Sequence, residues 1–230
     1  MWYSFDFGIV HFIALDSETD FAKSPSYPFA EDISGNETLP TPSETYVTDA
    51  GPFGQVDNGA YTNNSAYEQV QWLKADLAAV NRTKTPWVIA MCHRPMYSTG
   101  VAGYQKNLRN AFQSIMLAGG VDVYFAGHAH WYERMYPIMA NGSVDAAAVL
   151  GNGTYLAREG VSMTHITNGA AGNLESHSTH SGPLLPVTAV LDQMHYGFSK
   201  LQIFNASALQ VQFIRGDGAG VGDQVTVLKR

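Results

Sequence analysis

The amino-acid sequence predicts an α/β (α+β) fold. Through the middle of the chain a helical pattern, an apolar run of strand length, a second helical pattern and a second apolar run follow one another. This alternation is typical of a sheet with helices packed against it. After about residue 160 the pattern changes to alternating segments separated by turn residues, which indicates further strands. With 230 residues, 45% of them hydrophobic, the chain can bury the core of one domain or slightly more.

The first third of the chain contains a predicted hairpin, a long polar segment and a helix. Two short alternating runs around Gly8 predict a hairpin over residues 3–16 that ends at Asp16. Residues 20–64 carry five prolines and many Ser, Thr, Asn and Gly, so we expect a surface excursion near a site, without regular structure. A capping-box pattern at Ser65 then precedes apolar residues at helical spacing, which predict a helix over 66–81.

Two apolar runs in the middle of the chain predict neighbouring strands. The run PWVIAMCH ends in His93, and the run VDVYFA is followed by Gly127, His128, Ala129 and His130. A helical pattern that ends before Gly119 separates the two runs. Open α/β sheets place their ligands at the carboxyl ends of the strands. We therefore expect the histidines that follow these runs to lie at one edge of the sheet.

These three histidines, His93, His128 and His130, are the candidate metal ligands. Residues i and i+2 of an extended segment face the same way, so His128 and His130 could present their nitrogens to one place while Ala129 turns away. Neutral imidazole is a good ligand of zinc, iron or manganese. The alternative interpretation is two surface histidines in a loop.

Other candidate residues have simpler explanations. A pair of metal ions that acts on phosphate usually shares oxygen ligands, and Asp16 is the local candidate, although aspartate is also a common turn residue. Cys92 should point away from His93 as a small buried hydrophobic residue. We expect solvated loop histidines at positions 177 and 180. We expect structural histidines at positions 11, 165 and 195.

Charge and hydropathy argue against two kinds of partner. A formal net charge of −7 and an isoelectric point near 5.5, with scattered Lys and Arg, do not suit nucleic acid. No apolar run approaches the roughly 18 residues that a membrane span needs. The amino-terminal residues show the alternation of strands and lack the basic start and small-residue cleavage site of a signal peptide. No membrane partner is therefore predicted.

Glycosylation signals are more frequent than expected by chance. Six of the 12 asparagines begin an Asn-x-Ser/Thr triplet, where random Ser and Thr frequency would give roughly two. These residues are Asn36, Asn63, Asn81, Asn141, Asn152 and Asn205. The excess predicts a secreted, extracellular glycoprotein, and polar loops rich in Asn, Ser and Thr are the alternative explanation.

Several motifs together resemble the fungal secreted purple acid phosphatases of the metallophosphoesterase superfamily. They include WYSFDFGIVHFIALDSETDF, KTPWVIAMCHRPMYS, GHAHWYERMYP, THITNGAAGNLESH and HYGFSKLQIF, and they run almost from end to end. The resemblance implies the C-terminal part of a four-layer αββα sandwich. Residues 1–140, with the long loop 20–64, would be the C-terminal half of the catalytic core, and residues 141–230 a β-rich region that completes the same domain.

The resemblance also implies a dinuclear metal centre, with Fe(III) beside Zn(II), Mn(II) or Fe(II) in the complete enzyme. His93 and His128 resemble ligands of the divalent metal, and His130 resembles a ligand of the iron. Glu133 and Arg134 would orient the imidazoles, with a surface ion pair as the alternative. The implied reaction is the hydrolysis of phosphate monoesters by attack of a dimetal-bound hydroxide.

Three motifs of the family, GDxG, GDxxY and GNH, are absent from this sequence, so no catalytic residue is identified in it. The chain resembles the C-terminal half of such an enzyme, and the missing N-terminal half is a possible partner. Alone, the chain is expected to bind metal weakly and to have little phosphatase activity. Two alternatives are a non-catalytic secreted glycoprotein with a vestigial metal site and a related metallophosphodiesterase.

Overall fold

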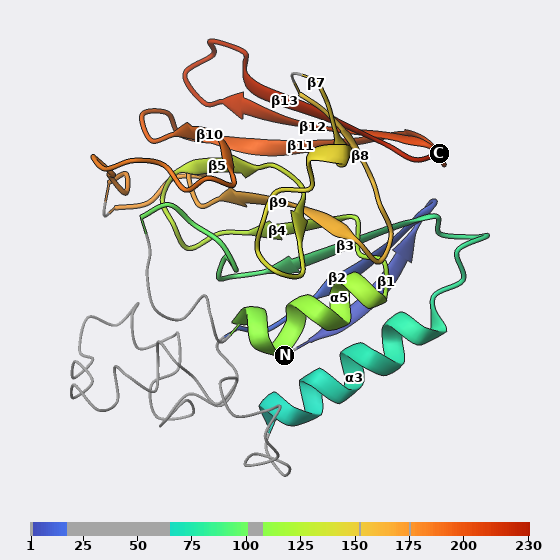
Figure 1. Ribbon diagram of the computed structural model, residues 1–230. Coiled ribbons are helices and arrows are strands. Elements are labelled where there is room, and N and C mark those ends of the chain that lie inside the picture. Colours follow the sequence, from blue (N-terminus) through green and yellow to red (C-terminus); the bar gives the residue numbers. More distant parts are fainter. Residues whose placement is uncertain (1, 18–64, 101–107, 152, 175) are drawn as a thin grey trace.

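The computed structural model describes residues 2–17, 65–100, 108–151, 153–174 and 176–230. They form two stacked sheets, with helices on the outer face of the first sheet (Figure 1). The first sheet has the strand order β1-β2-β3-β4-β9-β5-β10, and β6 pairs with β9 outside this path. Its strands are β1 (Tyr3–Phe7), β2 (Val10–Ala14), β3 (Trp87–Cys92), β4 (Val123–Ala126), β5 (Tyr132–Met135), β6 (Ile138–Met139), β9 (Ser162–Asn168) and β10 (Thr188–Asp192).

The second sheet has the order β11-β12-β13-β8-β7. Its strands are β7 (Val149–Gly151), β8 (Thr154–Leu156), β11 (Gly197–Asn205), β12 (Ala208–Arg215) and β13 (Val221–Leu228). The helices are α3 (Ser65–Ala79), the π-helix η2 (Arg109–Gln113), α5 (Ser114–Ala118) and the short 3-10 helix η3 (Ala146–Ala148). Within the described ranges, no helix is long and apolar enough to cross a membrane.

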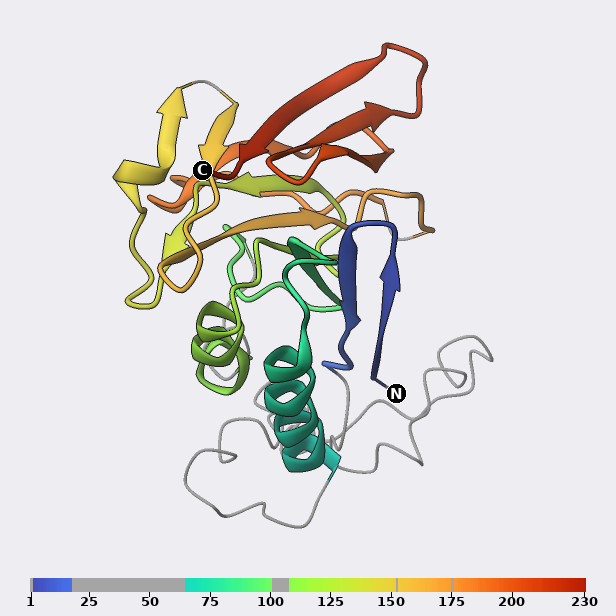
Figure 2. The ribbon, with the colours of Figure 1, turned by 90° about the vertical axis from the view of Figure 1, so that its right-hand side faces the viewer.

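Two apolar cores hold the layers together. Leu73 of α3 and Phe112 of η2 pack with Val88 and Ala90 of β3 between the helices and the first sheet. Ile89 of the same strand faces the other way, into the core between the two sheets. The apolar run of β3 is therefore continuous because both faces of the strand are buried. Figure 2 shows the resulting order of helices, first sheet and second sheet.

Most elements lie where the sequence predicts them. The β1–β2 hairpin turns at Gly8, which has φ of +59°. The predicted helix over 66–81 is α3, and the second predicted helix is divided between the π-helix η2 and α5. The described residues form three of the four layers expected for an αββα sandwich. The predicted excursion over 20–64 lies outside the described residues.

Strand β9 joins a later part of the chain to the first sheet. This strand lies between β4 and β5 and pairs parallel to β4. Residues 162–168 therefore lie in the same sheet as strands from the first 140 residues.

Candidate metal centre

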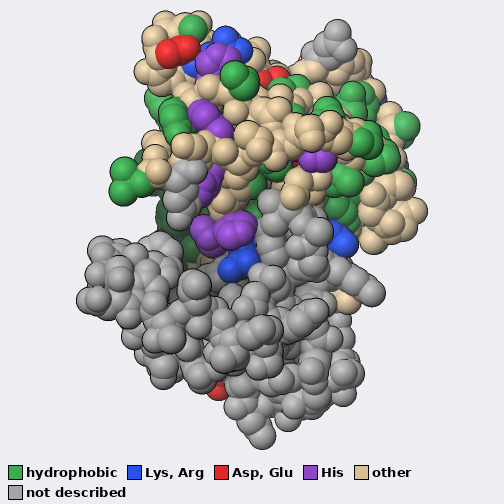
Figure 3. All heavy atoms as spheres, turned by 90° about the vertical axis from the view of Figure 1, so that its left-hand side faces the viewer, with side chains coloured by type: hydrophobic (Ala, Val, Ile, Leu, Met, Phe, Trp, Pro, Cys, Tyr) green, Lys and Arg blue, Asp and Glu red, His purple; other side chains and the backbone are tan. Residues whose placement is uncertain are grey.

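The candidate site lies at the carboxyl edge of the parallel strands β2, β3 and β4. Asp16 follows β2, His93 follows β3, and Gly127 follows β4. The Gly127 N–H donates to the His93 carbonyl oxygen at 2.9 Å, so the loops after β3 and β4 are joined. Several histidine side chains lie along this face of the molecule (Figure 3). The expected convergence of the strand ends is thus observed.

His93 and His128 face each other at this edge. Their Nε2 and Nδ1 atoms are 3.1 Å apart, and the two rings are 5.0 Å apart at an angle of 81°. Two nitrogens bound to one cation at about 2.1 Å, with tetrahedral to octahedral angles, would lie about 3.0–3.4 Å apart. The side chain of His93 is exposed and that of His128 is half-buried. The pair therefore fits two ligands of a single metal ion.

The backbone at His128 differs from the sequence prediction. His128 has φ of +63°, and the Ala129 N–H donates to the Gly127 carbonyl oxygen at 2.8 Å. In the same way, the Trp131 N–H donates to the Ala129 carbonyl oxygen, two residues earlier, at 2.8 Å. The segment consists of two successive three-residue turns, so the prediction of an extended segment is wrong. Ala129 is buried, but His128 and His130 are not related by strand alternation.

Segments far along the chain hold His130 in place. The His130 N–H donates to Ser178 Oγ at 3.0 Å, and its carbonyl oxygen accepts from the Ser178 N–H at 3.2 Å. At Gly169, a Cβ atom would clash with the Ala129 carbonyl oxygen. Sequence reasoning missed Ser178 and Gly169, and the glycines of NGAAG were the only signal of a close backbone approach.

The structure brings together only part of the predicted ligand set. Within the described ranges, no group of three or more His, Cys, Asp or Glu side chains could hold a metal ion. His93 and His128 form a pair, His130 is half-buried nearby in sequence, and Asp16 is half-buried. The Asp16 backbone is held by Gln69, through bonds of 2.7 and 2.8 Å.

Glu133 and Arg134 are both buried, so a surface ion pair is the wrong interpretation of these residues. Glu133 accepts hydrogen bonds from Thr99 Oγ1 at 2.5 Å and Thr188 Oγ1 at 2.7 Å. Arg134, on β5 of the first sheet, binds Asp223, on β13 of the second sheet. The Nε–Oδ2 distance is 2.6 Å and the Nη2–Oδ1 distance is 3.0 Å. Burial alone would raise the pKa of Asp223, but the hydrogen bonds and charge of Arg134 lower it.

Three of the remaining predictions need correction. Cys92 is half-buried against the helix-side core rather than fully buried. His177 and His180 are half-buried rather than fully solvated: the His177 ring stacks on Tyr196 with the ring centres 4.0 Å apart, and the backbone N–H of His180 donates to Gln193 Oε1 at 2.7 Å. The contacts with Tyr196 and Gln193 come from a later segment, which sequence spacing does not reveal, whereas the contact of 3.1 Å between His180 Nε2 and the Pro183 carbonyl oxygen is local.

The other three histidines are structural, as expected, but one has an unusual environment. His11 lies between Asp6 and Asp76, and His195 contacts Asp192. His165 is buried, and neither ring nitrogen has a hydrogen-bond partner among the residues that the structure describes. Burial, helped by the charge of Arg109, lowers the pKa of His165 to about 3.

Comparison with known proteins agrees with this geometry. The family model described as calcineurin-like phosphoesterase matches residues 13–132, which is about half of the chain. The model described as iron/zinc purple acid phosphatase-like protein C matches residues 162–224. The chain belongs to the purple acid phosphatases of the calcineurin-like phosphoesterase family. Membership implies a dinuclear metal centre in the complete enzyme.

Relatives of this purple acid phosphatase chain are longer than the chain itself. It is 57% identical to an acid phosphatase of Aspergillus ficuum over 99% of its own length and 37% of that protein. It is 33% identical to acid phosphatase A of Cryphonectria parasitica, over 99% of its length and 39% of that protein. The chain thus spans well under half the length of these relatives.

Solved structures support the fold. A purple acid phosphatase from yellow lupin seeds matches 99% of this chain and 32% of its own, with a TM-score of 0.67 and 21% identity. The Plasmodium protein GAP50 matches the whole chain and 55% of its own, with a TM-score of 0.61 and 15% identity. At these identities the likeness concerns the fold alone.

Proposed function

We propose that this chain is part of a metal-dependent acid phosphatase that hydrolyses phosphate monoesters. The observation that carries the proposal is the His93–His128 pair, with nitrogens 3.1 Å apart at the carboxyl edge of a phosphoesterase sheet. His93 and His128 would hold the divalent metal, and His130 the iron. A centre of Fe(III) beside Zn(II), Mn(II) or Fe(II) would neutralise phosphate oxygens and activate water for attack on phosphorus.

The two facing histidines would contribute lone pairs from defined atoms. His93 would use Nε2 and keep its proton on Nδ1, whereas His128 would use Nδ1 and keep its proton on Nε2. The left-handed backbone at His128 directs its ring toward His93, and such strain is common where a structure must fix a functional group. The backbone would thereby position the pair for a metal ion.

The rest of the ligand set would come from another part of the complete enzyme. Two close nitrogens are too few for two metal ions that act on phosphate, and the relatives are much longer than this chain. We infer that the chain alone binds metal weakly and has little activity. A polypeptide that supplies the missing N-terminal half is the partner that would restore both.

Metal binding and phosphatase activity test this proposal separately. We expect the purified chain to bind Zn²⁺ weakly by calorimetry, and His93→Asn and His128→Asn each to weaken that binding at least about tenfold. His195→Asn is the matched control, because His195 contacts Asp192 away from the pair. Unchanged Zn²⁺ binding in both test variants would refute the site.

The reaction class is tested on the complete enzyme. Residues of the related full-length protein joined upstream of this chain should give rapid hydrolysis of p-nitrophenyl phosphate and little hydrolysis of bis-p-nitrophenyl phosphate. Preference for the diester would favour the metallophosphodiesterase alternative. Full metal loading without hydrolysis of either compound would favour the non-catalytic glycoprotein.

We also propose that the protein is secreted and glycosylated. Three of the six sequon asparagines lie in the described residues, and Asn81, Asn141 and Asn205 are all exposed. In each, Oδ1 accepts hydrogen bonds from the N–H and hydroxyl of the Ser or Thr two residues later. Expression in a secreting yeast should give glycan masses on these three residues, and their complete absence would contradict the proposal.

A further inference from the structure

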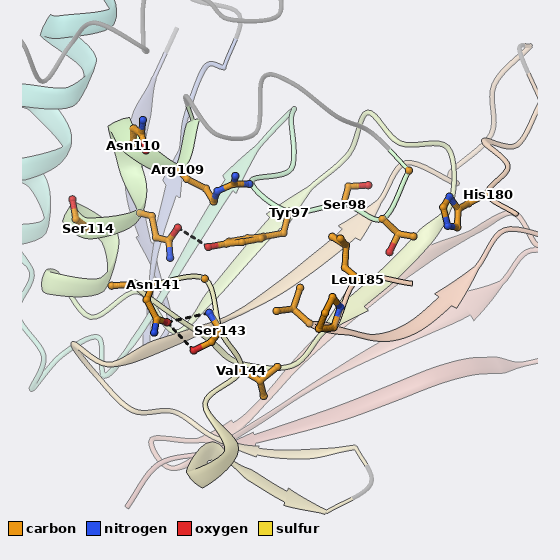
Figure 4. A pocket seen from close by; sticks show the side chains of 17 residues that line it. Tyr97, Ser98, Arg109, Asn110, Ser114, Asn141, Ser143, Val144, His180 and Leu185 are labelled. Carbon is orange, nitrogen blue, oxygen red and sulfur yellow. Dashed lines mark hydrogen bonds between the residues drawn. The ribbon is translucent and has the colours of Figure 1, made fainter. Parts of the chain in front are cut away.

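A cavity of about 1070 Å³ lies on the helix side of the first sheet, apart from the His93–His128 pair. The π-helix η2 forms one wall, residues 140–144 form a second, and residues 185–187 form a third (Figure 4). Neither His93 nor His128 lines it. The volume lies slightly above the usual range for small-molecule sites, which is about 300–1,000 Å³.

The charge of the cavity lining is opposite to that of the chain. The whole chain has a net charge of −7, yet among the described residues neither Asp nor Glu lines this cavity. Within the described part of the lining, Arg109 at the start of η2 is the one side chain that is always charged. An anion that entered would therefore meet this cation, with no carboxylate from the described residues facing it.

Arg109 is held in place by two contacts, neither of which is with a carboxylate. Its Nη1 donates to the Met96 carbonyl oxygen at 2.7 Å, and its guanidinium lies over the Tyr97 ring, 4.8 Å from the ring centre. The part of the chain that the structure describes contains no carboxylate within salt-bridge distance of Arg109. A guanidinium has five N–H donors in a fixed plane, so an anchored one can still bind phosphate or carboxylate through two parallel bonds.

Polar and apolar walls complete the cavity. The Tyr97 hydroxyl donates to Gln113 Oε1 at 2.8 Å, which fixes the aromatic ring as part of the wall. Ser98 also lines the cavity, is 3% exposed, and its hydroxyl has no hydrogen-bond partner among the described residues. Leu185 and Val187 add apolar surface. The lining therefore suits an organic body as well as a charged group.

We propose that this cavity is a second binding site, for a small organic anion whose phosphate or carboxylate group binds Arg109. The Ser98 hydroxyl would supply a further hydrogen bond to the ligand, and the aromatic and apolar walls would hold its organic part. The site does not depend on phosphatase activity, because none of these groups belongs to the metal pair.

The cavity also shares walls with the histidine loop. Gly100 lines the cavity and packs directly against the Trp131 ring, which follows His130 in the chain. On the other side, Ser178 binds the His130 backbone and His180, two residues later, lines the cavity. A ligand in the cavity would therefore contact the segments that hold His130.

Calorimetry on metal-free protein tests the proposal. The full chain is produced in bacteria, so that every molecule carries an unmodified Asn141, which also lines the cavity. After removal of metal by a chelating resin, glycerol 2-phosphate, citrate and neutral glycerol are titrated separately. We expect saturable binding of one or both anions and none of glycerol, and the preferred anion identifies the charged group.

Two variants and two controls decide the location. Removal of a hydrogen bond to a charged group weakens binding by about 10- to 100-fold, which is the loss expected for Arg109→Gln. Ser98→Ala should weaken binding by about two- to fivefold without lowering the melting temperature, because the hydroxyl has no partner in the free protein. Lys200→Gln, on the exposed side of β11, and the double variant H93N/H128N should bind as the unmodified chain does.

Several results would overturn the proposal. The first is the absence of anion binding at concentrations up to about 10 mM, which would mean a binding free energy weaker than about 3 kcal/mol. The others are equal binding of neutral glycerol and loss of anion binding in H93N/H128N. If Arg109→Gln does not fold, Arg109→Lys replaces it and should still weaken binding because lysine lacks the planar fork. Unchanged affinity in both Ser98→Ala and the Arg109 variant would also refute the site.

Discussion

Substitution of Asp223 tests the link between the two sheets. Asp223 on β13 accepts two hydrogen bonds from Arg134 on β5, at 2.6 and 3.0 Å, and a third from the Tyr132 hydroxyl at 2.8 Å. Arg134 is only 5% exposed. Asp223→Asn keeps one acceptor oxygen and places an NH2 group at the other position, so at least one charge-assisted bond, worth about 1.5–3 kcal/mol, is lost. The buried guanidinium loses its counter-ion, and breaking such a pair costs about 3–5 kcal/mol.

We therefore expect Asp223→Asn to lower the free energy of unfolding by about 3–5 kcal/mol at neutral pH, measured by urea denaturation. Asp217→Asn is the control, because Asp217 is exposed and should change stability by less than about 0.5 kcal/mol. The pKa of Asp223 is lowered in the folded chain. Its contribution is thus complete above the ordinary aspartate pKa of 3.8 and is lost as the pH falls through the lowered value. A loss below about 1 kcal/mol at pH 7 would refute the reasoning.

Three further substitutions test buried and strained positions. The pKa of His165 is about 3 in the folded chain and 6.5 in the unfolded chain, so keeping this histidine buried and neutral lowers the free energy of unfolding by about 2 kcal/mol at pH 5. His165→Leu should therefore raise the melting temperature more at pH 5 than at pH 7.5. Equal shifts at the two pH values would contradict this. Gly169→Ala should weaken Zn²⁺ binding and lower the melting temperature, because its Cβ would displace the Ala129 carbonyl; unchanged values in both measurements would contradict the close approach. His128→Asn should lose Zn²⁺ affinity without loss of stability, since asparagine tolerates positive φ; a lower melting temperature would show that the histidine itself stabilises the loop.

The sequence predicts the local elements of this fold better than their pairing. The apolar runs at β3 and β4 identify strands because both faces are buried, which removes the need for polar alternation. The position of β9 between β4 and β5 has no local signal. Strand order depends on contacts between segments tens of residues apart. The period-two pattern within a strand indicates which side chains share a face but does not predict which other strand will pair with it.

The candidate site shows the same division. His93 and His128 could be placed at one sheet edge because parallel strands end on the same side. Their 3.1 Å approach could not be predicted, because it depends on a left-handed backbone at His128 that alternation in an extended chain excludes. The burial of Glu133 and Arg134 was equally hidden, since two successive charged residues on an interior strand face two different cores.

The strained loop explains why residues beyond 160 matter to a site that ends at His130. A non-glycine residue with positive φ costs free energy and persists only when surrounding contacts determine it. Here those contacts are the backbone approach at Gly169 and the paired hydrogen bonds of Ser178 to His130. Both residues follow β9 in the chain, and β9 pairs directly with β4. The segment that matches the purple acid phosphatase C-terminal model therefore holds the geometry of the histidine loop, even though it supplies none of the three predicted ligands.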